Sequence, residues 1–180
     1  MSRRFRLTFF IIIPISLLFL LISYVLYFEE QGNFHMITPG EAYRSAQLDG
    51  DELKYYIKKY NIKSVFSLRG GNANADWYRE ETKICIDNRV AYYSIALSAR
   101  QEPSEKDIKK ITEIFSSAPR PVLIHCKGGA DRTGLVAAMW KVIIDKEPKS
   151  EARNQLSPMF FHFSIGKTAS LDRFFEKWQP

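Results

Sequence analysis

The sequence predicts an α/β fold, with a mostly parallel central sheet flanked by helices and a transmembrane helix before it at the N-terminus. Two observations favour this class. After residue 41, short segments with the two-residue alternation of strands take turns with longer segments whose apolar residues recur at helical spacing, which is typical of a parallel sheet covered on both faces. Before residue 29, an uncharged apolar run spans residues 7–28. At 180 residues and 46% hydrophobic, the chain can bury the core of one domain but hardly of two.

The N-terminal segment has the length and the flanks of a membrane anchor. At about 1.5 Å per residue, a helix over residues 7–28 matches the ~30 Å of a bilayer core. Arginines precede this run and Glu29 and Glu30 follow it, so the positive-inside rule places the remainder of the chain on the periplasmic or extracytoplasmic side. A cleaved signal peptide is the alternative, although its apolar region is usually ~7–15 residues long and ends in small residues, whereas residues 24–28 read YVLYF.

The chain therefore divides into three parts. Residues 1–28 form a cytoplasmic stub and transmembrane anchor, residues 29–41 form a linker rich in turn-forming residues, and residues 42–180 form one folded domain. Within this domain we expect helices over residues 51–60, 77–86 and 133–144, and strands over residues 62–68, 90–95 and 122–125. Ser104, with Asp107 as a variant capping box, predicts the start of a further helix with a buried stripe of Ile108, Ile111, Ile114 and Phe115.

Charge and cysteine content exclude several classes. The formal net charge is +6, but three of the positive residues precede the apolar run and the rest are mixed with acidic residues, so a nucleic-acid partner is not expected. Two cysteines, Cys85 and Cys126, are too few for a disulfide scaffold. A single bridge between them stays open, although a reactive Cys126 would argue against a permanent one. Cys85 otherwise reads as a small packed hydrophobe.

One connection in the domain has the composition of a phosphate-binding loop. The strand over residues 122–125 ends at His125, and the residues that follow are Cys126, Lys127, Gly128, Gly129, Ala130, Asp131, Arg132 and Thr133. Gly128 and Gly129 permit positive φ, which lets successive N–H groups point inward and bind a tetrahedral oxyanion at a helix N-terminus. Arg132 adds a guanidinium fork that matches two phosphate oxygens, and the same positive field favours the thiolate of Cys126.

The chemistry that follows from such a loop is a covalent phosphoryl transfer. A thiolate below the bound phosphorus can attack in line to form a phosphocysteine, which water then hydrolyses. Thr133 is placed to hydrogen-bond the sulfur and ease its departure, and His125 is expected to orient the loop rather than act as a base. A nucleotide-binding loop is excluded because no Gly-Lys-[Ser/Thr] follows the glycines. A zinc site from His125, Cys126 and Asp131 lacks the usual ligand spacing.

The run 125-HCKGGADRTG-134 resembles the HCxxGxxR[ST]G signature of the cysteine-based protein tyrosine phosphatase superfamily. The short chain and the upstream pattern 43-YRSAQL-48 resemble its small dual-specificity branch, especially the exported bacterial members. The resemblance covers about residues 34–178. It implies Cys126 as the nucleophile, Arg132 as the phosphate clamp and the backbone of residues 127–131 as the cradle, with no metal and no cofactor. The domain over residues 42–180 is thus expected to be a phosphatase catalytic domain.

The general acid has two candidates. The resemblance implies an Asp on a separate upstream loop, which would protonate the leaving oxygen, but no Asp occurs between Asp87 and Asp107. Glu102, directly before Pro103, is the substitute by position and chemistry. Asp131, inside the loop, is the other, and myotubularin-type lipid phosphatases resemble this chain in having an Asp directly before the loop Arg.

For each of three other polar residues, two roles are open. His162, among aromatic residues, is expected to pack or to belong to a lid. Arg44 and Arg69 follow predicted strand segments and could face the anion or form surface ion pairs.

The substrate stays open between three hypotheses. The first is a phosphorylated protein, attacked by a tyrosine or dual-specificity phosphatase. The second is a phospholipid, because Lys127 and Asp131 resemble phosphoinositide enzymes and an anchor would hold the site beside lipid headgroups. The third, from a different class, is a phosphate-binding module without turnover.

Overall fold

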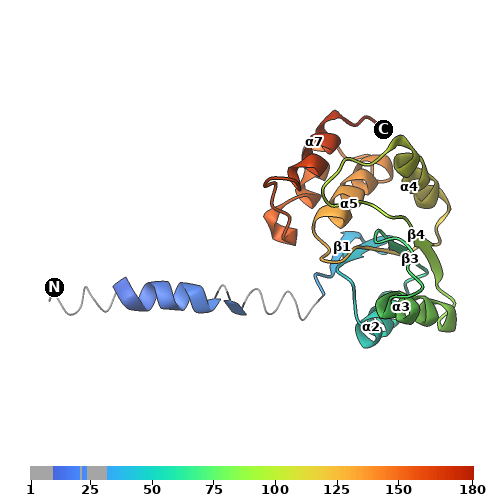
Figure 1. The fold of residues 1–180 in the computed structure, drawn as a ribbon, viewed down its shortest axis with the longest axis horizontal. Helices are drawn as coiled ribbons and strands as arrows, with labels where there is room; N and C mark the ends of the chain where they lie inside the picture. The colour runs from blue at the N-terminus through green and yellow to red at the C-terminus, as the bar shows by residue number, and fades with distance from the viewer. Residues whose placement is uncertain (1–9, 21, 24–31) are drawn as a thin grey trace. The chain divides into compact units, whose positions relative to one another are not determined.

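The computed structural model describes residues 10–20, 22–23 and 32–180 and divides into two units, Met1–Gln31 and Gly32–Pro180. In the first unit, residues 10–20 and 22–23 are helical (Figure 1). No helix among the described residues is long and apolar enough to cross a membrane. The predicted span over residues 7–28 includes residues 7–9, 21 and 24–28, which lie outside the described residues, as do residues 29–31 of the predicted linker.

A five-stranded sheet in the order β1-β2-β5-β3-β4 forms the centre of the second unit. β1 pairs with β2 in antiparallel orientation, and the pairs β2–β5, β5–β3 and β3–β4 are parallel. The strands are β1 (His35–Thr38), β2 (Ala42–Ser45), β3 (Ser64–Ser67), β4 (Ala91–Ser94) and β5 (Val122–His125). The predicted mostly parallel sheet is therefore confirmed.

The first strand corrects one boundary of the sequence analysis. β1 lies inside residues 29–41, which were expected to be a linker, so that prediction is wrong for His35–Thr38. In this edge strand only Ile37 is fully buried. A single buried position in a four-residue segment leaves too little alternation for the pattern to show.

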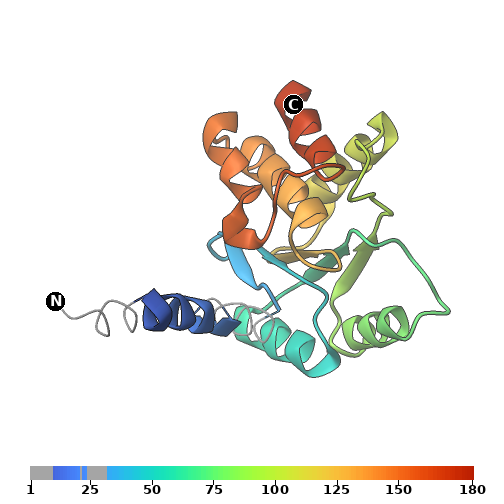
Figure 2. The same ribbon diagram turned by 60° about the vertical axis from the view of Figure 1, so that its left-hand side comes forward.

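Helices cover both faces of the sheet (Figures 1 and 2). On one face lie α2 (Gly50–Tyr60) and α3 (Asp76–Asp87), whose apolar side chains share a core with Val65 and Leu123. On the other lie α4 (Glu105–Ser117), α5 (Asp131–Ile143) and α7 (Ala169–Lys177), which share a core with Phe66 and Ile124. Adjacent residues of the central strands thus face opposite cores, as the pleat requires.

The predicted helices are present with small shifts at their ends. Ser104 caps α4 as expected, since its Oγ accepts a hydrogen bond from Asp107 N at 3.2 Å and Asp107 Oδ2 accepts one from Ser104 N at 2.9 Å. α5 begins at Asp131 rather than at Thr133, which shortens the preceding loop. Cys85 is fully buried, and burial raises the pKa of its thiol to about 12, so it packs as a hydrophobe.

The segment after α5 had no predicted elements and lies against that helix. It contains α6 (Lys149–Ala152), the 3₁₀ helices η1 (Arg153–Gln155) and η2 (Pro158–Phe160), and α7. α6, η1 and α7 all contact α5. This packing returns the C-terminal part of the chain to the helix that begins at the candidate loop.

Candidate active site

The candidate loop lies at the carboxyl end of the central strand. β5 pairs with β2 on one side and β3 on the other, and Cys126 follows its last residue, His125. We call residues 126–132 the cysteine loop. Cys126 is only 3% exposed, and α5 starts at Asp131 within the same loop. The thiol and the positive end of a helix are therefore placed together where ligands bind in open α/β sheets.

The carbonyl groups of residues 127–129 point away from the inner side of the cysteine loop, toward the surrounding protein. The carbonyl oxygens of residues 127, 128 and 129 accept hydrogen bonds from Gln47 N (3.1 Å), Asn33 Nδ2 (3.1 Å) and Arg44 Nη2 (2.8 Å). Because the carbonyl and the N–H of one planar trans peptide point in opposite directions, the following N–H groups face the inner side of the loop. No N–H of residues 127–130 donates a hydrogen bond to any other residue that the structure describes. The inner face is thus a cradle of amides suited to an oxyanion.

The two glycines of the loop differ. Gly129 has φ +69°, and a Cβ there would lie 2.6 Å from Ala46 N and 2.7 Å from the carbonyl carbon of Ser45. Gly128 does not have a positive φ, and a Cβ there would meet nothing within 4 Å. Of the two glycines, Gly129 uses the positive φ that both permit, and this single left-handed residue turns the loop against β2.

Arg132, the second residue of α5, is held by the ends of two strands. Its Nη1 donates to the carbonyl oxygens of Leu68 (3.2 Å) and Leu97 (3.4 Å), which follow β3 and β4. A second guanidinium belongs to the same neighbourhood. Arg69 donates to Gln47 Oε1 at 2.8 Å and lies 3.6 Å from the centre of the Trp77 ring. Burial, and then the charge of Arg132, lowers the pKa of Arg69.

Arg44 supports the cysteine loop from behind. It is fully buried, and its Nη1 donates to both the carbonyl and the side-chain oxygen of Gln155 at 2.8 Å, while Nη2 bonds the Gly129 carbonyl. Its guanidinium also lies 3.9 Å from the centre of the Phe160 ring. Burial lowers the pKa of Arg44 to about 9, against the opposing effect of nearby Cys126, so the group is charged at neutral pH. Both sequence readings of Arg44, as an anion contact and as a surface ion pair, are therefore wrong.

A buried network surrounds His125. Its Nε2 is 2.9 Å from Glu81 Oε1, and its Nδ1 is 3.2 Å from the Cys126 carbonyl oxygen. Glu81, 3% exposed, also accepts hydrogen bonds from Gln47 Nε2 (2.9 Å) and Tyr92 Oη (2.8 Å). Burial alone would raise the pKa of Glu81, but nearby His125 and these hydrogen bonds bring it below its ordinary value. These contacts are consistent with an orienting role for His125.

The other supporting residue does not make its expected contact. Thr133 is completely buried, and its Oγ1 has no hydrogen-bond partner among the described residues. The hydrogen bond predicted from Thr133 to the Cys126 sulfur is therefore not formed. Lys127, by contrast, has an exposed side chain at the start of the loop.

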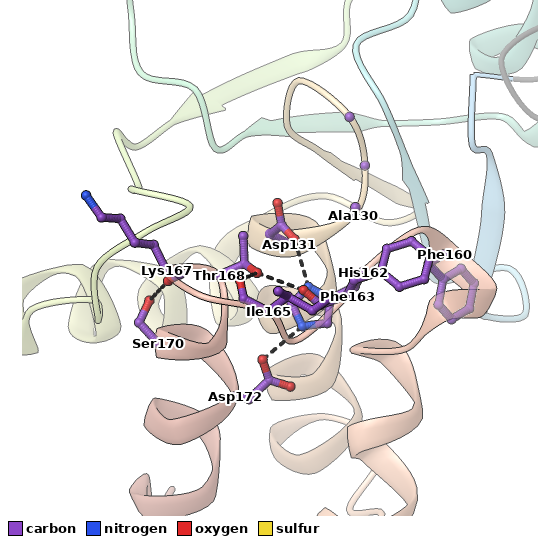
Figure 3. Close-up of polar contacts among 12 residues, drawn as sticks. Ala130, Asp131, Phe160, His162, Phe163, Ile165, Lys167, Thr168, Ser170 and Asp172 are labelled. Carbon is purple, nitrogen blue, oxygen red and sulfur yellow. Dashed lines mark hydrogen bonds and ion pairs between the residues drawn. The ribbon is translucent and has the colours of Figure 1, made fainter.

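The two candidate acids lie in different surroundings. Glu102 is exposed between β4 and α4, and its Oε1 is 4.0 Å from Lys177 Nζ, a long ion pair at the surface. Asp131 is part of the cysteine loop. Its Oδ1 is 2.7 Å from Nδ1 of His162, and Nε2 of that ring is 2.9 Å from Asp172 Oδ2 (Figure 3). Of the two candidates, Asp131 lies within the cysteine loop and Glu102 lies outside it.

Sequence reasoning missed the roles of Gln47, Glu81 and Asp172. One signal was available for Glu81, which lies three residues after Tyr78 and three before Ile84 on the inner face of α3. A carboxylate in the apolar stripe of a helix needs a buried partner. The side-chain partners of Gln47 lie 22 and 34 positions away, and Asp172 lies ten positions from His162, so no helix or strand period links them.

The fold and the site together define a phosphatase of the protein tyrosine phosphatase and dual-specificity type, a phosphoric monoester hydrolase. Residues 34–170 match the family described as "DSP-PTPase phosphatase fused to NAD+ Kinase", and the chain belongs to this family.

Solved structures with the same fold include phosphatases with different ligands. A variant of TpbA from P. aeruginosa in complex with pTyr is 19% identical, with a TM-score of 0.63 over 81% of this chain and 84% of that one. The catalytic core of the PP-IP phosphatase SIW14 from S. cerevisiae, in complex with citrate, is 20% identical, with a TM-score of 0.64 over 82% and 85%. PTPMT1 in complex with PI(5)P is 15% identical, with a TM-score of 0.58 over 80% and 95%. At these identities the likeness concerns the fold.

Proposed function

We propose that the protein is a cysteine-dependent phosphatase that hydrolyses phosphotyrosine or other phosphorylated residues of proteins through a phosphocysteine intermediate. The observation that carries the proposal is the cysteine loop, in which outward carbonyls, the left-handed Gly129 and the braced Arg132 leave an amide cradle around the Cys126 thiol. Such a cradle binds a tetrahedral dianion and presents its phosphorus to the sulfur.

The proposed reaction has two steps. The Cys126 thiolate forms an S–P bond as the P–O bond to the leaving group breaks, and Asp131 gives its proton to the departing oxygen. Water then attacks the phosphorus, the P–S bond breaks, and Asp131 takes a proton from that water, which restores both groups. Arg132 and the loop amides stabilise the charge that develops on the equatorial oxygens in both steps. Because Asp131 belongs to the loop, it needs no separate acid-bearing segment.

The test is phosphate release from a phosphotyrosine peptide by the full chain in mild detergent, beside Cys126→Ser. Release that disappears in the variant supports the proposal. Equal release by both proteins contradicts the thiolate mechanism. A chain that binds the phosphopeptide without releasing phosphate would act as a binding module instead.

A phospholipid substrate is the second candidate. The exposed Lys127 at the start of the cysteine loop and Arg69 near Arg132 supply positive charge beyond the cradle, which a lipid headgroup with more than one phosphate could use. The discriminating experiment compares turnover of phosphoinositide vesicles with turnover of phosphopeptides. A preference for vesicles that is lost in Lys127→Gln favours the lipid, and a preference for peptides favours the protein substrate.

We also propose that residues 7–28 anchor the protein in a membrane, with the catalytic domain on the periplasmic or extracytoplasmic side. The support is the uncharged run with arginines before it and Glu29 and Glu30 after it. Fractionation and protease accessibility in intact cells test this. Recovery of the full chain with membranes, and of a chain without residues 1–28 in the soluble fraction, is the expected result. Full-length protein in the soluble fraction would contradict it.

A further inference from the structure

A buried histidine joins the cysteine loop to the C-terminal part of the chain. His162 is 1% exposed, and its two ring nitrogens lie against two carboxylates, Asp131 Oδ1 at 2.7 Å and Asp172 Oδ2 at 2.9 Å. Asp131 belongs to the loop and to α5, and Asp172 belongs to α7. Figure 3 shows the imidazole between the two carboxylates, with the second oxygen of Asp131 directed away from the ring. The proposed mechanism assigns no role to His162 or Asp172.

The backbone around His162 is shaped to hold the ring in this place. Phe161 has φ +61°, the left-handed region that a bulky side chain seldom adopts, and the His162 N–H donates to the Ser157 carbonyl at 3.2 Å. After His162, the Thr168 hydroxyl bonds the carbonyls of Phe163 (2.7 Å) and Ile165 (2.9 Å) and so closes the turn that leads into α7 (Figure 3). Strained conformations of this kind persist where the surrounding structure determines them, and they cluster at functional sites.

The hydrogen bonds determine the protonation of the ring. Asp172 accepts as a carboxylate, and Oδ1 of Asp131 accepts also when Oδ2 carries the proton, so a ring that bonds both oxygens donates from both nitrogens and is an imidazolium. Burial alone would lower the pKa of His162, but the hydrogen bonds and charges of Asp131 and Asp172 raise it above its ordinary value. The titratable groups that face the ring are Asp131 from α5 and Asp172 from α7. The negative charge of Asp172 also offsets the positive charge of the imidazolium. Asp131 therefore accepts a hydrogen bond from an oriented N–H that belongs to a nearly neutral His162–Asp172 pair.

We propose that His162, itself held by Asp172, is a positioning residue for the loop carboxylate Asp131. The imidazolium occupies Oδ1 of Asp131 and leaves Oδ2 as the oxygen that exchanges protons. Oδ2 then gives its proton to the leaving oxygen when the P–O bond breaks and takes one from water when the P–S bond breaks, while His162 keeps both of its own. This inference rests on the proposed function for the proton transfer, but the paired ring is a property of the fold.

A positioning role and a purely structural tie predict different kinetics. If His162 only holds the segment in place, its loss lowers the rate for all phosphate esters alike. If His162 orients the acid, its removal lowers the rate for esters whose leaving oxygen needs a proton, such as phenyl phosphate. The rate for 4-nitrophenyl phosphate, whose leaving group departs as an anion, then changes little.

The experiment compares the full chain with His162→Asn and His162→Gln on these two esters. The Asn amide can stand where Nδ1 stood and still donate to Asp131, whereas the Gln amide reaches toward the place of Nε2. We expect His162→Gln to lose ~10–100-fold in kcat/KM for phenyl phosphate and less than about 3-fold for 4-nitrophenyl phosphate, with His162→Asn in between. Equal losses on both esters, or no loss on either, would overturn the proposal.

A measurement without turnover keeps the proposal testable if these variants do not fold. Nitrogen NMR of the unmutated chain should show both ring nitrogens of His162 protonated at neutral pH, and Asp131→Asn should move the titration of the ring to lower pH. A neutral ring in the unmutated chain would overturn the proposal. If the unmutated chain hydrolyses neither ester, the proposed function fails, and a doubly protonated ring that responds to Asp131→Asn still supports the pairing.

Discussion

Replacing Gly129 by alanine tests the backbone of the cysteine loop directly. At φ +69° a residue with a Cβ is strained, and the new methyl would lie 2.6 Å from Ala46 N and 2.8 Å from the Ser45 carbonyl oxygen. These are backbone atoms of and beside β2, which is paired on both sides, so they cannot move aside as the end of a flexible side chain could. The loop itself has to shift.

The size of the effect follows from two contributions. The left-handed conformation costs an alanine about 1–2 kcal/mol, and overpacking against fixed atoms adds about 1–3 kcal/mol, so the free energy of unfolding should fall by roughly 2–5 kcal/mol. For a unit of this size the melting temperature should fall by roughly 4–20 °C. If the loop relieves the clash by moving, a misplaced cradle should lower kcat/KM by on the order of 10²-fold.

Gly128→Ala is the matched control. It adds the same methyl to the neighbouring residue, where φ is not positive and nothing lies within 4 Å. Thermal unfolding and hydrolysis of 4-nitrophenyl phosphate are measured for both variants and the unmutated chain. We expect Gly128→Ala to resemble the unmutated chain. If Gly129→Ala matches Gly128→Ala in both melting temperature and kcat/KM, the reasoning about the turn is refuted.

Three further substitutions test other parts of the site. Arg132→Lys removes the planar fork and should lower kcat/KM by about 10²-fold, and near-normal hydrolysis would contradict the clamp. Glu81→Gln should cost about 1–3 kcal/mol at neutral pH in urea unfolding. Because the pKa of Glu81 is lowered on folding, this difference should be present above ~pH 4.3 and vanish as pH falls through the lowered value. In Arg44→Lys, the lysine cannot bridge Gln155 and Gly129, so turnover should fall by about 10-fold or more. The turnover of Arg69→Lys, measured in the same assay, is the comparison.

Much of the fold was predictable because it depends on local patterns. The signals for the helix that Ser104 caps and for the apolar strand before Cys126 each lie within a few consecutive residues. The structure has both elements at the predicted places. The segment after α5 was not predictable in this way. Its short helices have few residues, and their packing on α5 is a matter of tertiary contacts.

The same distinction between local patterns and tertiary contacts holds for the candidate site. The loop residues from Cys126 to Arg132 are contiguous, and their types and order alone predict an anion cradle. The sequence singled out Arg44 as a candidate site residue, but its role as a support of the loop could not be predicted, because its partner Gln155 lies 111 positions away.

By itself, the sequence determined that this protein has an α/β domain with a cysteine loop between a buried strand and a helix, since neighbouring residues carry that information. Only the tertiary structure decided what lies behind the loop, namely the buried Arg44, the Glu81–His125 pair and the His162 bridge. Charged groups can be buried only with partners, and those partners come from elements far apart in the chain. Their roles exist only once the sheet and its two helical layers are packed together.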